Sequence, residues 1–83
     1  MEDEIEYDVE RDIKALGDSV TVIDQMLSID EPTEEDLDTL DRNVRHIEIT
    51  LAKNHIKNSG KKLKPFEDAV KAARQAYPNL KEA

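Results

Sequence analysis

The sequence has no cysteine and no tryptophan, and it has only two glycines and three prolines in 83 residues. Without cysteine, neither a disulfide nor a thiolate-bound metal can stabilise the fold. Apolar residues occur at most two in a row, which excludes a transmembrane helix and a signal-peptide core within these residues. The acidic first residues also argue against an organellar transit peptide. We therefore expect a cytoplasmic protein, in the host cytoplasm or the virion if it is phage-encoded.

The length predicts a single small domain. A chain of this size buries about 60–65% of the surface that its unfolded state exposes. Its free energy of unfolding should then be a few kcal/mol. We assign residues 1–78 to the domain and expect residues 79–83 to form a frayed C-terminal tail.

Charge is divided unevenly between the two halves of the chain. Residues 1–41 contain 16 acids and two bases, a net charge of −14, whereas residues 42–83 contain four acids and ten bases, a net charge of +6. Such asymmetry indicates either a charged partner or two halves that fold against each other. The helix pattern favours the second interpretation.

A first helix is predicted over about residues 3–28. Its apolar residues recur every three or four positions and so form one helical face, at Ile5, Val9, Ile13, Leu16, Val20, Ile23 and Leu27. Gly17 lies within this stretch and weakens a helix by about 1 kcal/mol relative to alanine. The apolar face keeps its phase across Gly17, which favours one helix over two.

A second helix is predicted over about residues 34–57. Thr33 has the position of an N-cap, and Asp36 follows three residues later as in a capping box. An apolar face follows at Leu37, Leu40, Val44, Ile47 and Leu51. Residues 46–51 also alternate between polar and apolar, as a half-buried strand does. An α+β fold with two short strands is therefore an alternative, although the longer helical pattern outweighs it.

The second helix carries a further apolar stripe, at Ile49, Ala52 and Ile56. A helix with two apolar faces needs two neighbours, and a third helix over about residues 65–77 can supply one of them. Pro65 fits the first turn of that helix, and Pro78 ends it. The predicted fold is all-α, an antiparallel helical hairpin plus a shorter third helix in a three-helix bundle. In this hairpin, Asp12 faces the basic end of the second helix.

No pattern of residues predicts an enzyme, a metal site or a cofactor. The acids of residues 30–41 lack the central glycine of a calcium loop. His46 and His55 are nine residues apart, so on one helix they point to opposite sides. The segment 59–62, Ser-Gly-Lys-Lys, lacks the full spacing of a phosphate-binding loop. We therefore expect no catalytic residue, cofactor, metal ligand or small-molecule substrate.

Two functional hypotheses remain. In the first, the chain is a protein–protein interaction module that self-associates or docks on a larger protein, as a phage or mobile-element accessory or structural protein could. Its candidate apolar contacts are Val22, Met26, Ile49 and Ile56. In the alternative, an acidic face imitates nucleic acid and occupies a basic groove of another protein, through Glu4, Asp8 and Asp12. Direct nucleic-acid binding is not expected, because the domain is acidic overall and has only three aromatic residues, Tyr7, Phe66 and Tyr77. Membrane contact is not expected either.

Overall fold

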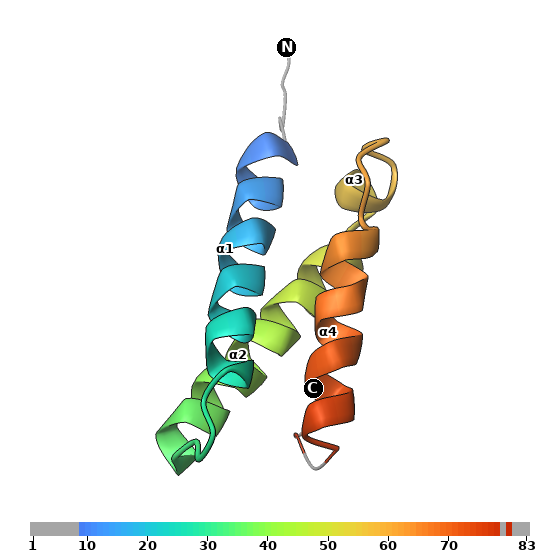
Figure 1. Cartoon of the computed structure of the whole chain (residues 1–83). Helices are drawn as coiled ribbons and strands as arrows, with labels where there is room; N and C mark the ends of the chain where they lie inside the picture. The colour runs from blue at the N-terminus through green and yellow to red at the C-terminus, as the bar shows by residue number, and fades with distance from the viewer. Residues whose placement is uncertain (1–8, 79, 81–83) are drawn as a thin grey trace.

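The computed structural model describes residues 9–78 and residue 80, and within these residues it contains helices and no strand. The helices are α1 (Val9–Leu27), α2 (Glu34–Leu51), α3 (Asn54–Lys57) and α4 (Lys64–Ala76) (Figure 1). The predicted all-α fold is confirmed. The α+β alternative is wrong, because residues 46–51 are helical throughout. No helix in the described part of the chain is both long enough and apolar enough to cross a membrane.

The three long helices pack together as a bundle. α1 and α2 form the predicted antiparallel hairpin, and α4 packs against both of them (Figure 1). Seven buried residues from the three helices form the core, namely Leu16, Ile23, Leu40, Val44, Ile47, Ala69 and Ala73. Each large aliphatic side chain in this set stabilises the fold by about 1.5–3 kcal/mol through burial.

α1 is a single helix across Gly17. The helix runs without interruption from Val9 to Leu27, and a Cβ atom added at Gly17 would meet no atom within 4 Å. Gly17 is therefore tolerated and is not required by packing. The predicted start of this helix at residue 3 lies outside the described residues.

α2 begins at the capping box that the sequence predicts. The Asp36 backbone N–H donates to Thr33 Oγ1 over 3.1 Å, and the Thr33 N–H donates to Asp36 Oδ2 over 3.0 Å. These bonds satisfy two backbone donors, and a cap of this type is worth about 1 kcal/mol.

The second helix ends earlier than its sequence predicts. α2 stops at Leu51, the backbone of Lys53 is extended (φ −74, ψ 137), and the short α3 follows. The prediction of one helix to residue 57 is therefore wrong. The break redirects α3 so that Ile56 becomes fully buried, and this burial compensates for the interrupted helix.

The chain after α4 turns back onto the bundle. α4 begins and ends within one residue of the predicted range 65–77. The Leu80 N–H donates to the Tyr77 carbonyl oxygen over 3.1 Å, and Leu80 packs against the core. Leu80 belongs to the segment 79–83 that is predicted to be frayed, and the fraying of that segment stays a prediction. Residues 79 and 81–83 lie outside the described residues.

Candidate interaction site

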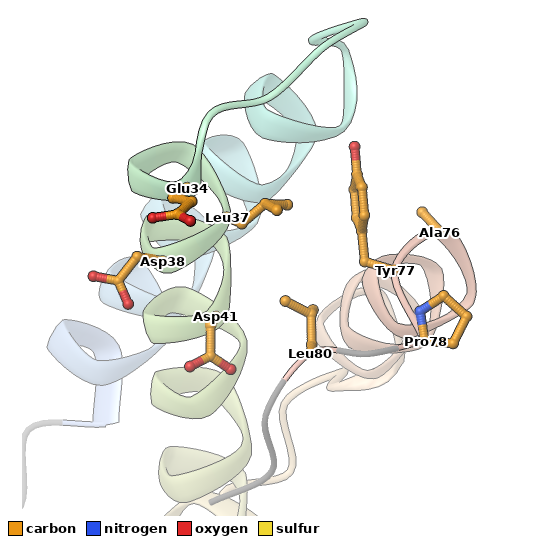
Figure 2. Close-up of a pocket in the computed structure, with 8 residues that line it drawn as sticks. All are labelled: Glu34, Leu37, Asp38, Asp41, Ala76, Tyr77, Pro78 and Leu80. Carbon is orange, nitrogen blue, oxygen red and sulfur yellow. The ribbon is translucent and has the colours of Figure 1, made fainter.

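A cleft of about 650 Å³ opens between the first half of α2 and the chain that follows α4 (Figure 2). Its lining combines acidic and apolar residues, namely Glu34, Leu37, Asp38, Asp41, Ala76, Tyr77, Pro78 and Leu80. Ligand sites in proteins commonly have volumes of roughly 300–1,000 Å³ and a mainly apolar lining. The volume of the cleft therefore lies within the range of known ligand sites.

The end of α4 forms one wall of the cleft. The Tyr77 N–H still bonds to the Ala73 carbonyl oxygen over 2.9 Å, but the Tyr77 backbone (φ −133, ψ 80) has left the helix. Pro78 cannot continue the helix because it has no N–H donor. The turn that follows places Leu80 on the bundle, and Figure 2 shows Tyr77 and Leu80 on the side of the cleft opposite α2.

The first half of α2 forms the other wall, with its apolar and acidic side chains separated. Figure 2 shows Leu37 extending toward Tyr77 and Leu80, whereas the carboxylates of Glu34 and Asp38 are directed away from them. Residues at positions i and i+3 or i+4 share a side of a helix, so the acids border the apolar part along α2. The cleft consequently has an apolar interior and an acidic edge.

Asp41 is the one buried acid of the cleft. The residue is only 9% exposed, and its Oδ1 atom is buried without a hydrogen-bond partner. Its Oδ2 atom lies 3.3 Å from Nε of Arg45, one helical turn away, and this Nε atom also lacks a hydrogen bond. A buried polar group without a partner costs about 1–3 kcal/mol. Asp41 Oδ1 is therefore a buried acceptor beside the cleft whose hydrogen-bonding capacity is unused within the described residues.

An ion pair holds α4 on α2 beyond the cleft. Nη2 of Arg74 lies 2.8 Å from Glu48 Oε1, and Nε of Arg74 lies 3.2 Å from Glu48 Oε2. Both side chains are partly buried, and a two-pronged arginine–carboxylate pair fixes orientation as well as distance. The pair keeps the two helices in contact at Glu48, while the start of α2 lies away from the end of α4 (Figure 1).

The predicted apolar contact residues fall into different environments. Ile56 is fully buried in the bundle, so it is a core residue and not an exposed contact. Val22 and Met26 are half-buried, and Met26 packs against the core. Ile49 is 56% exposed. The predicted stripe of Ile49, Ala52 and Ile56 is therefore split by the break after α2, and only its last member is buried.

Ile49 lies on the solvent face of α2. Nine residues separate it from Leu40, which places the two side chains about 180° apart at 100° per residue. Arg45 lies one turn before Ile49 and Arg42 lies two turns before it, and each arginine pairs with an aspartate four residues earlier. Ile49 is thus a single apolar residue in a polar, charge-balanced surface.

The predicted acidic face is described only at Asp12, because Glu4 and Asp8 lie outside the described residues. Asp12 Oδ2 is 2.6 Å from Nε2 of His55, which joins α1 to α3. The hydrogen bond from His55 is the main reason why the pKa of Asp12 lies below its ordinary value of 3.8, with smaller contributions from the charges of His55 and Lys53. Asp12 therefore serves an internal contact, as the hairpin alignment predicts, and the nucleic-acid-mimic hypothesis stays a prediction.

The remaining polar candidates have structural contacts. His46 Nδ1 lies 3.0 Å from Ser19 Oγ and links α2 to α1. Gly60 has φ +77, a conformation that favours glycine, and the Lys61 N–H donates to Ser59 Oγ over 3.2 Å in the same turn. Among the described residues, no three histidine, aspartate or glutamate side chains are grouped so that they could hold a metal ion.

The cleft itself is absent from the sequence-based predictions. Its two walls are about 40 positions apart in the sequence, and only the packing of α4 brings them together. One signal was available: Tyr77 and Leu80 flank Pro78, and apolar residues directly after a helix stop often pack back onto that helix.

Within the described residues, the fold and the cleft define a small all-α bundle that carries an acidic-edged groove. No family model, no curated protein and no solved structure matches the chain. Arguments about its function therefore depend on its own residues.

Proposed function

We propose that the chain is a non-enzymatic protein–protein interaction module that docks on a larger protein by accepting part of that protein in the cleft. The observation that supports this proposal is the apolar interior of the cleft, which no other segment among the described residues covers. Covering apolar surface contributes roughly 25 cal/mol per Å². Because Leu37, Tyr77 and Leu80 are only partly buried, a partner gains this contribution by inserting side chains between them.

The module carries its apolar groove on rigid elements. The capping box fixes the start of α2, and the Glu48–Arg74 pair fixes α4 against α2. A groove whose walls are held in place loses little conformational entropy when it is filled. This arrangement suits docking of a side chain, whereas two hydrophobic walls without such anchors would collapse together.

Selection from a random-peptide library tests the proposal for a partner of any sequence. The immobilised full chain should enrich peptides whose binding is lost in the variant Leu80→Ser. Leu80 lies after the last helix, so this change should leave the helices intact, and circular dichroism checks that they are. The matched control is Ile49→Ser, which changes an exposed isoleucine outside the cleft and should leave peptide binding unchanged.

The opposite pattern contradicts docking in the cleft. Peptides that bind Leu80→Ser as well as the unmodified chain would show that the binding surface lies elsewhere. A library that yields no enriched peptide at all would remove the cleft as a docking site for protein segments.

Self-association is a second candidate, favoured by Ile49. This residue is the one large hydrophobic side chain that is exposed among the described residues, and a second copy could cover it. Light scattering after size exclusion should then give a dimer that Ile49→Ser converts to a monomer. A monomer at both low and high salt in the unmodified chain would contradict self-association and leave docking on a larger protein.

A further inference from the structure

The cleft combines two kinds of surface that together indicate its occupant. We infer that the partner places a lysine or arginine side chain in the cleft, with the aliphatic part on Leu37 and Leu80 and the cation at the carboxylate of Asp41. The inference rests on the proposed function, because it names the chemistry of the partner that this cleft accepts.

The apolar interior fits the stem of such a side chain. Leu37, Tyr77 and Leu80 are partly buried residues that pack against the core. Figure 2 shows Leu37 directed from α2 toward the Tyr77 ring, and Leu80 between α2 and the end of α4. Lysine and arginine carry three or four methylene groups that lie along apolar surface while the charged head reaches a polar group. A short polar side chain would leave this surface uncovered.

The acidic edge fits a cation. Residues 30–41 contain seven acids and no base. Near the cleft, Asp38 pairs with Arg42 and Asp41 is approached by Arg45, but no cation in the described part of the chain pairs with Glu34. The three acids of the cleft therefore exceed their two nearby arginines by one negative charge. This excess charge belongs to Glu34 at the edge, and it attracts a cationic head into the cleft and repels an anionic one.

Asp41 provides the independent observation that points to a donor. The residue is only 9% exposed, and its Oδ1 atom has no hydrogen-bond partner. An ammonium or guanidinium group is a stronger donor to a carboxylate than a neutral group is. A purely apolar occupant has no donor and leaves Oδ1 unsatisfied, whereas a cation beside the carboxylate can satisfy it.

A metal ion does not fit the same place. Calcium and magnesium need several oxygen ligands around one point. Figure 2 shows the carboxylates of Glu34 and Asp38 directed away from the interior of the cleft. No three potential ligands are grouped for a metal ion among the described residues. A cation that carries its own apolar stem is therefore the better match.

Small-molecule probes distinguish the contribution of the positive charge from that of the aliphatic stem. We would titrate the ¹⁵N-labelled chain with n-pentylammonium, n-butylguanidinium and the uncharged n-pentanol, and follow the amide shifts of residues 34–41 and 76–80. Both cations should bind about tenfold more tightly than pentanol at low salt, because a hydrogen bond to a charged group contributes more than a neutral contact. This preference should shrink in about 0.5 M NaCl, where charges are screened over a few ångströms.

Two variants test whether the cation binds at the carboxylate of Asp41. Asp41→Asn should reduce the preference for the cations to no more than about twofold. Glu34→Gln should reduce it by less, because Glu34 is exposed at the edge. Glu67→Gln, an exposed acid at the start of α4, is the control and should leave the preference unchanged. If Asp41→Asn loses its helical circular dichroism, Glu34→Gln and the salt series decide the matter.

The outcomes distinguish this inference from the proposed function. Equal binding of cations and pentanol at the cleft would overturn the cation inference and leave the apolar groove in place. A cation preference that neither variant nor salt reduces would also overturn it, since the charge would then be recognised elsewhere. If no probe shifts the cleft residues, the proposed function loses its groove together with this inference.

Discussion

The rest of the bundle covers the C-terminal end of α2 more completely than its N-terminal end. Around its C-terminal end the bundle is closed: Ile56 is fully buried, Asp12 bonds to His55, and Glu48 pairs with Arg74. Around its N-terminal end the bundle is open: a cleft of about 650 Å³ separates α2 from the end of α4, and Asp41 Oδ1 has no partner. We call these the closed end and the open end.

The comparison shows where this small bundle keeps unsatisfied groups. At the closed end, Ile56, Asp12 and Glu48 have partners within the chain, so these residues contribute to folding. At the open end, a partly covered apolar surface and a buried carboxylate oxygen lack partners among the described residues. Natural proteins satisfy most buried polar groups, and Asp41 Oδ1 is an exception to which our further inference assigns a partner.

The largest expected effect on stability comes from removing a buried side chain at the closed end. Replacing Ile56 by alanine should lower the free energy of unfolding by about 3 kcal/mol, because it removes buried methyl groups and leaves a cavity. Urea denaturation followed by circular dichroism measures the change. The control Ile49→Ala, on the solvent face, should change stability by no more than about 0.5 kcal/mol. Equal effects of the two variants would contradict the assignment of Ile56 to the core.

The two glycines should respond in opposite directions. Gly60→Ala should destabilise the turn beside the closed end by about 1–2 kcal/mol, because alanine is strained at φ +77. Gly17→Ala should stabilise α1 by about 0.5–1 kcal/mol, because alanine favours the helix and the added Cβ meets no atom within 4 Å. Thermal unfolding of both variants checks these signs, and a stabilised Gly60→Ala would show that the turn differs from the one described.

The ion pairs of the two ends should also differ in strength. Glu48→Gln removes the partly buried pair with Arg74 and should cost about 1 kcal/mol. Asp38→Asn removes an exposed pair with Arg42 near the open end and should cost no more than about 0.5 kcal/mol. Chemical denaturation of both variants under the same salt gives the comparison. A larger loss in Asp38→Asn would mean that the open end is held more firmly than its contacts indicate.

The smallest expected effect is a change in stability at low pH. The pKa of Asp12 is lowered in the folded chain by its hydrogen bond from His55. A carboxyl group with a lowered folded pKa adds stability above its ordinary pKa, and this contribution disappears as the pH falls below 3.8 through the lowered value. The stability advantage of the unmodified chain over Asp12→Asn should therefore shrink below that pH.

Asp18→Asn is the control for this pH series, because it removes an exposed charge from the same helix. Its difference from the unmodified chain should not follow the same course. If the Asp12→Asn difference stays constant down to the lowest pH at which the chain is folded, the bond to His55 does not stabilise the closed end.

Much of the fold could be predicted from local signals. The spacing of Leu16, Ile23, Leu40 and Ile47 identified the core faces, and Thr33 with Asp36 marked the start of α2. These features depend on neighbours three or four residues away, which the sequence displays directly. The antiparallel hairpin followed from the short connection, and it placed Asp12 at the basic end where it meets His55.

The break after α2 and the cleft could not be predicted in the same way. The break depends on the burial of Ile56, and that burial exists only once α3 can turn toward the other helices. The cleft depends on the separation of α4 from α2 beyond the Glu48–Arg74 pair. Neither arrangement produces a periodic pattern of residues in the sequence, because both depend on contacts between segments that are far apart along the chain.

A residue-by-residue map of amide shifts in the presence of n-pentylammonium tests the central claim most directly. We expect the shifts to lie at the open end, in residues 34–41 and 76–80, and residues 53–57 of the closed end to stay unchanged. Shifts that gather at the closed end, or around Ile49 alone, would contradict the assignment of binding to the cleft.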